Sequence, residues 1–114
     1  ADKSIASIET ISAEDFAKIN LSNQLDIFDV RKSSEYDSAH IINAINTPLN
    51  DIDSNYDMYN KDGDVYIHCA GGYRSIIANS ILKSKGHHNL IDVLGGFSSI
   101  RNTDIPIKEN ICTN

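Results

Sequence analysis

The chain has 114 residues with ordinary hydrophobic content, which is enough for one domain with its own core and too few for two, so we expect a single domain over residues 1–114. Its formal net charge is −6 and it carries no basic stripe, which argues against nucleic acid and anionic membrane as partners. No apolar run is long enough to cross a bilayer, and residues 1–4 lack the apolar core of a signal peptide.

The first third of the chain predicts strand, helix and strand in turn. Residues 4–10 fit a short edge strand. Ser12–Asp15 has the pattern of a capping box and predicts a short amphipathic helix that ends near Asn20. Residues 25–30 are mostly apolar, as is typical of a strand inside a parallel sheet, and Asp29 lies near the carboxyl end of this strand.

The middle of the chain leads to a second buried strand. Ser33–Tyr36 predicts another cap and a short helix, and residues 44–46 predict a short strand. Residues 49–59 are polar with scattered apolar positions, which indicates short helical turns. A turn signal at Lys61–Asp64 precedes the apolar run at residues 65–68, which we expect to be the central strand of the sheet.

The last third continues the alternation of helix and strand. An amphipathic pattern from Ser75 predicts a helix with lysines in its last turn and Gly86 as a left-handed cap. The pattern then predicts a strand over 90–94, a glycine turn at 95–96, a short helix over 97–101 and a surface-docked tail from Ile105. Strands that alternate with helices indicate an α/β domain with a largely parallel sheet.

The stretch around Cys69 carries the chemistry. A buried strand ends at the cysteine, two glycines and Arg74 follow, and a helix begins at Ser75. In this order, backbone N–H groups of a tight loop and of a helix N-terminus converge on one point, where they bind anions and favour an ionised thiol. The alternative is an ordinary core cysteine beside a glycine turn. We favour a reactive thiolate, because a core cysteine does not require this loop.

The segment Cys69–Arg74, followed by Ser75, resembles the active-site loop of the single-domain rhodaneses, a family of sulfurtransferases. Other segments match the family in order: Asp29-Val30-Arg31, Glu35-Tyr36, His40-Ile41, Ala44–Asn46 with Pro48-Leu49, and Asp92-Val93 with Gly95–Phe97. Two positions depart from the family, since Asn43 replaces a glycine and Ile100 or a neighbour replaces an aromatic residue. The resemblance implies a three-layer α/β/α fold with a five-stranded, mainly parallel sheet of order 1-5-4-2-3 and the loop at its carboxyl end.

The resemblance also implies a reaction that needs no cofactor. Cys69 would accept a sulfane sulfur from thiosulfate or a low-molecular-weight persulfide and pass it to a thiol or another thiophilic acceptor, with cyanide as an assay acceptor. Backbone N–H groups from Ala70 to Ser75, through Gly71, Gly72, Tyr73 and Arg74, would bind the persulfide anion. We expect Gly71 and Gly72 to supply positive φ angles.

Two arginines are candidates for binding the substrate anion. Arg74 can favour the thiolate and hold an oxyanion, or it can close the loop by an ion pair with Asp29 or Glu35, and the two roles are compatible. Arg31 is a second candidate, with a surface ion pair as the alternative. We expect Asp29 to be a structural acceptor for a loop N–H group rather than a catalytic acid.

The remaining candidates have supporting roles. We expect His68 to point to the face opposite Cys69, and Tyr73 to form a wall of the pocket mouth. His40 is expected to be structural, and His87-His88 to lie on the surface at a helix end. None of the four histidines has metal-ligand spacing, so no metal site is predicted.

Cys112 is the second cysteine, and it stands far from Cys69 in the sequence. Two cysteines so placed do not make a disulfide framework and suit a reducing compartment, so we expect a cytoplasmic location. Cys112 can resolve a Cys69 persulfide if the tail folds back, but we interpret it as a bystander.

Two other functions fit parts of the pattern. A cysteine-dependent phosphatase or arsenate reductase of related fold uses the same strand, loop and helix, but its loop is one residue longer than the four residues between Cys69 and Arg74. A non-catalytic rhodanese-like binding module keeps the fold with a blocked pocket. In addition, Tyr66–Ser75 and the tail resemble the C-terminal rhodanese domain of chains that carry a metallo-β-lactamase-fold persulfide dioxygenase, which implies a possible fusion partner.

Overall fold

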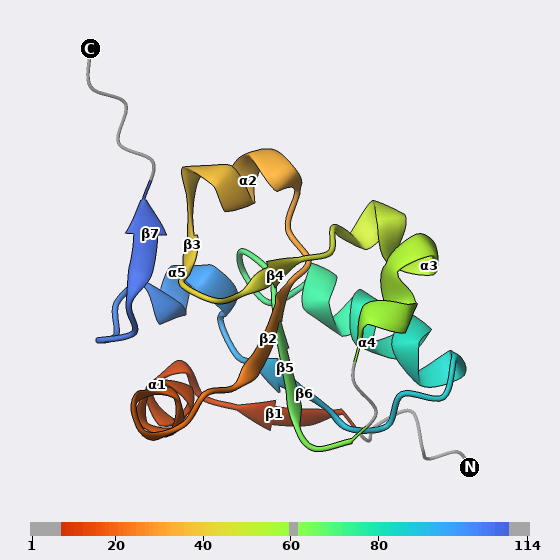
Figure 1. Ribbon diagram of the computed structural model, residues 1–114, viewed down its shortest axis with the longest axis horizontal. Helices are drawn as coiled ribbons and strands as arrows, with labels where there is room; N and C mark the ends of the chain where they lie inside the picture. Colours follow the sequence, from red (N-terminus) through yellow and green to blue (C-terminus); the bar gives the residue numbers. More distant parts are fainter. Residues whose placement is uncertain (1–7, 60–61, 110–114) are drawn as a thin grey trace.

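The computed structural model describes residues 8–59 and 62–109. Its centre is a parallel sheet built from β1 Glu9–Ile11, β2 Asp26–Asp29, β4 Ile45–Asn46, β5 Val65–His68 and β6 Leu90–Val93 (Figure 1). The strand order is β1-β6-β5-β2-β4, and each neighbouring pair is parallel. When the five strands of this sheet are counted in chain order, the sequence is 1-5-4-2-3, as the resemblance implied.

A second, two-stranded sheet was not predicted. It pairs β3 Ala39–Ile41 with β7 Ile107–Glu109 in antiparallel register (Figure 1). Segments of three residues are too short to show an alternating pattern, and the two partners lie far apart in the sequence, so no local signal marks them. The pairing shows that the described part of the tail docks on the domain, as expected. Residues 4–7 of the expected edge strand and residues 110–114 lie outside the described residues.

The helices begin and end close to their predicted positions. They are α1 Ala13–Ser22, α2 Ser33–Ser38, α3 Ile52–Asn55, α4 Arg74–Ser84 and α5 Gly96–Ile100. The side chain of Ser12 accepts the N–H of Asp15 at 3.1 Å, which is the predicted N-cap of α1. The α2 cap stands one residue before the predicted one, because the N–H of Lys32 donates to the Glu35 carboxylate at 2.9 Å. Among the described residues, no helix has the length and apolar character needed to span a membrane.

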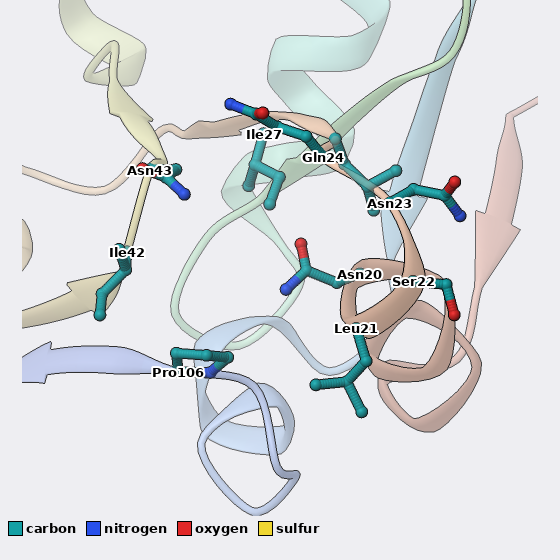
Figure 2. Close-up of a pocket in the computed structure, with 10 residues that line it drawn as sticks. Asn20, Leu21, Ser22, Asn23, Gln24, Ile27, Ile42, Asn43 and Pro106 are labelled. Carbon is teal, nitrogen blue, oxygen red and sulfur yellow. The ribbon is translucent and has the colours of Figure 1, made fainter.

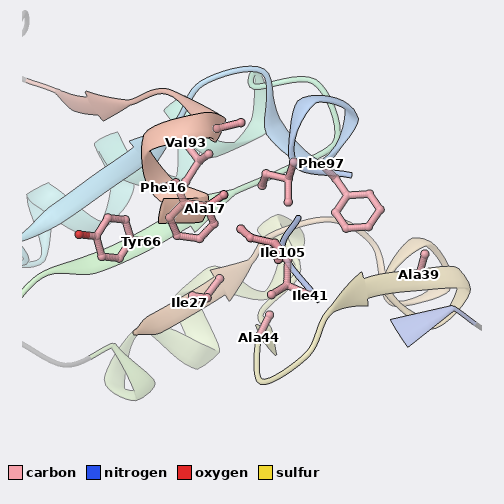
Figure 3. Packing of buried hydrophobic residues seen from close by; sticks show 12 residues of the cluster. Phe16, Ala17, Ile27, Ala39, Ile41, Ala44, Tyr66, Val93, Phe97 and Ile105 are labelled. Atoms are coloured by element: carbon pink, nitrogen blue, oxygen red, sulfur yellow. The ribbon is translucent and has the colours of Figure 1, made fainter. Parts of the chain in front are cut away.

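Two apolar clusters hold the helices against opposite faces of the sheet. On one face, Phe16 of α1 and Phe97 of α5 join a cluster that includes Ile27 of β2 (Figure 3). Ile100 of α5 belongs to the same cluster. On the other face, α4 brings Ala78 and Leu82 against Ile67 of β5, and Ile52 of α3 joins them. Full burial of one such side chain contributes about 1.5–3 kcal/mol, so these faces fix the three-layer α/β/α arrangement.

His87 corrects the expectation that both histidines after α4 lie on the surface. His88 is exposed, but His87 is only 2% exposed. The N–H groups of Gly86 and His87 donate to the Lys83 and Leu82 carbonyls at 3.0 Å each, and Gly86 has φ +96°. This C-cap turns the chain back toward the core. The His87 ring therefore packs edge-on against Tyr59, with ring centroids 6.1 Å apart.

Candidate active site

Cys69 lies where β5 ends, at the carboxyl edge of the parallel sheet. The loop after it runs to Arg74, where α4 begins, so strand, loop and helix follow in the predicted order. Asp29, the last residue of β2, is in register with His68, the last residue of β5. The ends of the two central strands therefore meet at this edge, which is the usual place for a binding site in an open α/β sheet.

The Cys69 sulfur is buried but meets polar groups. The residue is 1% exposed and touches the apolar cluster under α4, as the core-cysteine alternative requires. Its Sγ nevertheless accepts the N–H of Gly72 at 3.0 Å and lies 3.7 Å from the Ser75 Oγ. Gly72 is thus the member of the expected Ala70–Ser75 cradle whose backbone N–H bonds the sulfur, and Ser75 meets the sulfur through its side-chain hydroxyl instead. A sulfur that accepts an amide N–H in a closed site is set up to carry negative charge.

The two loop glycines have different roles. Gly72 has φ +97°, a left-handed conformation that suits glycine and brings its N–H to the sulfur. The same expectation is wrong for Gly71, whose φ is not positive and whose Cβ position is open space. Gly71 therefore has no backbone reason to be glycine among the described residues.

The N-terminus of α5 fixes the main chain of the loop, which the sequence did not predict. The N–H of Phe97 donates to the Cys69 carbonyl at 2.6 Å, and that of Ser98 donates to the Ala70 carbonyl at 3.0 Å. Gly96 makes this approach feasible: it has φ +59°, and a Cβ there would lie 2.5 Å from the Cys69 carbonyl oxygen. The glycine pair was visible in the sequence, but nothing local showed which backbone it would touch.

We expect Gly96→Ala to damage both the loop and the fold. The left-handed backbone alone costs about 1–2 kcal/mol for a residue with a Cβ, and the contact with a main-chain carbonyl adds to it. Urea unfolding should show at least this loss, and Cys69 should react more slowly with iodoacetamide because the loop is displaced. Gly63→Ala is the matched control, since Gly63 also has positive φ but nothing within 4 Å of its Cβ position. Equal losses of stability and of alkylation rate in the two variants would contradict the importance of the close approach between Gly96 and the Cys69 carbonyl.

Arg74 closes the loop by an ion pair, as one of its two expected roles required. Its two terminal nitrogens meet the Glu35 carboxylate oxygens at 2.7 and 3.0 Å. The hydrogen bond from Arg74 lowers the pKa of Glu35 from 4.5 to about 2, and Glu35 raises the pKa of Arg74. Both side chains are about one third exposed, so the Arg74 side chain is partly open to solvent. Tyr73 beside it is 76% exposed.

The Glu35 pKa predicts a stability change in acid. Because the folded-state pKa lies below the usual value, the pair stabilises the fold above about pH 4.5, and this contribution is lost as the pH falls toward about 2. Screening at this exposure limits the contribution to about 1 kcal/mol. The midpoint temperature of thermal unfolding should therefore fall more steeply between pH 6 and pH 2.5 for the parent protein than for Glu35→Gln. Parallel plots of midpoint temperature against pH for the two proteins would contradict a stabilising effect of the Arg74–Glu35 ion pair.

Arg31 and Asp29 form a buried pair, so the alternative of a surface ion pair for Arg31 is wrong, and its role as an anion-binding residue stays a prediction. The Asp29 carboxylate accepts the Arg31 backbone N–H at 2.9 Å, its Nε–H at 3.0 Å and a terminal N–H at 2.8 Å. The same terminal nitrogen donates to the Ala39 carbonyl at 2.6 Å. The guanidinium also lies 4.2 Å from the centre of the Phe97 ring. Asp29 thus acts as the structural acceptor that the sequence suggested, and Arg31 is bound on several sides.

His68 and His40 support neighbouring segments. The His68 ring is buried on the Phe97 side of the sheet, away from the cluster that holds Cys69, as its place on the strand predicted. Burial lowers its pKa, which keeps the ring neutral. The His40 Nδ1 lies 2.7 Å from the Tyr36 carbonyl oxygen, and its ring stacks on Tyr36 at 3.7 Å. Both histidines therefore hold structure rather than transfer protons to Cys69.

Other candidate sites are weaker. Within residues 8–59 and 62–109, no three His, Cys, Asp or Glu side chains gather as a metal site would require. Cys112 lies outside the described residues. A pocket of about 390 Å³ near the start of β2 is rich in side-chain amides (Figure 2). No residue of the Cys69 loop lines this pocket. It is lined by Asn20, Leu21, Ser22, Asn23, Gln24, Leu25, Ile27, Ile42, Asn43 and Pro106.

Comparisons of the whole sequence with known proteins identify a family and several relatives. A family model described as "Rhodanese-like domain" matches residues 12–103. The "Putative sulfur carrier protein YrkF" of Bacillus subtilis is 33% identical over 97 residues, which covers 84% of this chain and 52% of that protein. An "Adenylyltransferase and sulfurtransferase" of Ogataea parapolymorpha is 36% identical over 74 residues, which covers 63% of this chain and 19% of that protein. The chain thus spans about half or less of the length of these relatives.

Solved structures match over most of the chain. A rhodanese-like domain protein from Staphylococcus aureus has a TM-score of 0.77 and 32% identity, and the match covers 90% of this chain and 100% of that one. A rhodanese-related protein from Thermoplasma volcanium has a TM-score of 0.76 and 28% identity, covering 88% of this chain and 97% of that one. These two matches show that the chain and both proteins share one overall fold.

Proposed function

Since this chain belongs to the rhodanese-like domain family, we propose that it is a sulfurtransferase in which Cys69 carries a sulfane sulfur as a persulfide. The observation that carries the proposal is the Gly72 N–H, which points at the Cys69 Sγ from 3.0 Å at the end of the central strand. Relatives named for sulfur carriage and sulfur transfer support the same reaction.

The reaction has two displacement steps. In the first, the Cys69 thiolate attacks the outer sulfur of the donor, a Sγ–S bond forms, and the donor bond breaks with its electron pair on the leaving sulfite or thiolate. In the second, a thiol or cyanide acceptor attacks the outer sulfur of the persulfide. The Sγ–S bond then breaks, and its electron pair returns to Cys69. Both enzyme states are anions, so the same N–H donor stabilises each of them.

The residues around the loop divide into two groups. In our proposal, Ala70, Gly71, Gly72 and Ser75 surround the sulfur, and Tyr73 and Arg74 flank the entrance. Arg74 keeps its Glu35 partner, and its partly exposed side chain attracts an anionic donor. Asp29 and Arg31 support the loop from the neighbouring strand, and Arg31 is too fully bound for us to assign it a substrate contact.

The proposal also names the sulfur donor, the sulfur acceptor, the cellular location and a partner domain. Thiosulfate and low-molecular-weight persulfides such as glutathione persulfide are the donors, and a thiol is the acceptor. Cytoplasmic location rests on the cysteine usage of the sequence. A persulfide dioxygenase partner in the same polypeptide rests only on the resemblance of Tyr66–Ser75 and the tail.

The test compares two donors on the intact protein. The protein is incubated with thiosulfate or with glutathione persulfide, and the donor is then removed. The mass of the intact protein is measured by mass spectrometry, and cyanide is added so that released thiocyanate can be measured. We expect a gain of one sulfur atom, mapped to the Cys69 peptide, with at least one donor. No gain with either donor would leave a binding module without sulfur transfer. Rapid hydrolysis of an aryl phosphate that depends on Cys69 would instead identify a phosphatase.

A further inference from the structure

Asp92 is a buried carboxyl group that the proposed sulfur transfer does not use. It lies on β6 and is 1% exposed, and neither of its oxygens has a partner with good hydrogen-bond geometry among the described residues. A charged carboxylate is costly in such surroundings, and burial accordingly raises the pKa of Asp92. The neighbouring strand in the sheet is β5, which ends at the reactive cysteine.

Side-chain alternation places Asp92 on the same face of the sheet as Cys69. Ile67 and Cys69 belong to the apolar cluster that α4 covers, and Leu90 of β6 belongs to it too. Residues two apart on a strand point to the same face, so Asp92 faces α4 as Leu90 does. The register agrees, because Ile67 pairs directly with Asp92.

Ser75, in the first turn of α4, connects the two groups. Its Oγ lies 3.7 Å from the Cys69 Sγ. The Ser75 side chain also interacts with Asp92, lowering the pKa of that carboxyl against the larger effect of burial. Ser75 is itself fully buried, so its hydroxyl stands between a thiol and a carboxyl group in a site closed to bulk solvent.

We propose that Asp92, acting through the Ser75 hydroxyl, receives the proton that Cys69 releases. The S–H bond of Cys69 breaks and its proton moves to the Ser75 oxygen, while the Ser75 proton moves to a carboxylate oxygen of Asp92. The electron pair of the S–H bond stays on Sγ, and the negative charge moves from Asp92 to sulfur without any net gain. Asp92 touches neither substrate nor sulfur, so it is a positioning residue.

This exchange avoids two like charges in one buried site. A thiolate beside an ionised carboxylate would repel it, whereas a protonated Asp92 donates to Ser75 and leaves the Ser75 proton free to bond the sulfur. Among the described residues, strand register gives Asp92 the neighbours Thr10 of β1 and Ile67 of β5, and its side-chain partner on α4 is Ser75, so none of these three neighbours carries a charge.

The test measures the rate of Cys69 alkylation by iodoacetamide against pH, in a Cys112→Ser background so that one thiol reacts. We expect a two-step profile, because a thiol and a carboxyl group that share one proton through Ser75 release their two protons in separate macroscopic steps. Asp92→Asn should give a single step, shifted about one pH unit or more below the upper step of the parent, because the amide removes the like charge and still donates to Ser75. Ser75→Ala should raise the midpoint and reduce the further effect of Asp92→Asn, because only repulsion through space then remains between the two groups.

The plots of alkylation rate against pH distinguish proton transfer through Ser75 from a purely structural role of Asp92. If Asp92→Asn leaves the profile unchanged, or shifts it equally with and without Ser75, Asp92 does not act through Ser75 and the proposal is wrong. The inference rests on the proposed function only in taking Cys69 as the nucleophile. Because alkylation reports ionisation of Cys69 and not sulfur transfer, a failure here is distinct from a failure of the sulfur assay.

A second measurement does not depend on the folding of any variant at position 92. The infrared spectrum of protein labelled with carbon-13 in its aspartate carboxyl groups is recorded across the same pH range. We expect the carbonyl stretch of a protonated carboxylic acid to persist while Cys69 is already rapidly alkylated, and to disappear at the upper step. Rapid alkylation without that stretch would overturn the proposal.

Discussion

Cys69→Ser is expected to abolish thiocyanate formation from every sulfur donor while the protein stays folded. A serine hydroxyl does not ionise in the range where a thiol does, and it forms no persulfide, so loss of the nucleophile should reduce the rate on the order of a thousandfold or more. The hydroxyl can still accept the Gly72 N–H that the sulfur accepts now. The free energy of unfolding should therefore change by about 1 kcal/mol or less.

The second cysteine supplies the matched control for this variant. Cys112→Ser removes the other thiol of the chain and should keep the full rate, because Cys112 has no place in the proposed steps. Thiocyanate is measured for both variants with thiosulfate and with glutathione persulfide. A Cys69→Ser protein that retains activity would remove Cys69 from the reaction, and a Cys112→Ser protein that loses it would make Cys112 a resolving thiol.

Asp29→Asn is expected to lower the free energy of unfolding by about 3–5 kcal/mol, because it leaves the Arg31 charge buried without its partner. Asp29 is fully buried and Arg31 is 5% exposed, so water cannot replace the lost contacts. The measurement is urea unfolding followed by circular dichroism. This loss is a large part of the total stability of a domain of this size.

Two further variants separate burial from charge. Glu109→Gln breaks the Arg101–Glu109 pair, whose contact of 2.6 Å is as short but whose side chains are each 45% exposed, and it should change stability by about 1 kcal/mol or less. The double variant Asp29→Leu with Arg31→Met replaces both charges by apolar groups and should recover much of the loss. Similar losses from Asp29→Asn and Glu109→Gln would contradict the role of burial.

Local patterns predicted the elements that carry strong local signals. Ser12 caps α1 because a short hydroxyl side chain before an apolar period satisfies a free N–H, and that rule needs no tertiary information. The buried strands β2 and β5 were visible as apolar runs, and Gly86 was visible as a helix C-cap. The strand–loop–helix order around Cys69 follows from the same short-range logic, so the position of the site could be predicted.

Features that depend on long-range contacts could not be predicted. His87 follows a helix like any surface residue, and only the packing of Tyr59 against it shows that it is buried. Arg31 follows a buried strand and is typical of an exposed residue until Ala39 and Phe97 are seen around its guanidinium. Gly96 is one of six glycines, and its contact with the Cys69 carbonyl joins segments that are distant in the chain.

The lengths of the two outer strands bear on self-association. β1 has three residues and β4 has two, and each lies at one margin of the five-stranded sheet. Exposed sheet margins offer unpaired main-chain groups to other polypeptides, and short margins offer few of them. The fold therefore presents a poor template for intermolecular β-pairing and fibril growth, although the interior of its sheet consists of apolar strands that would aggregate readily if uncovered.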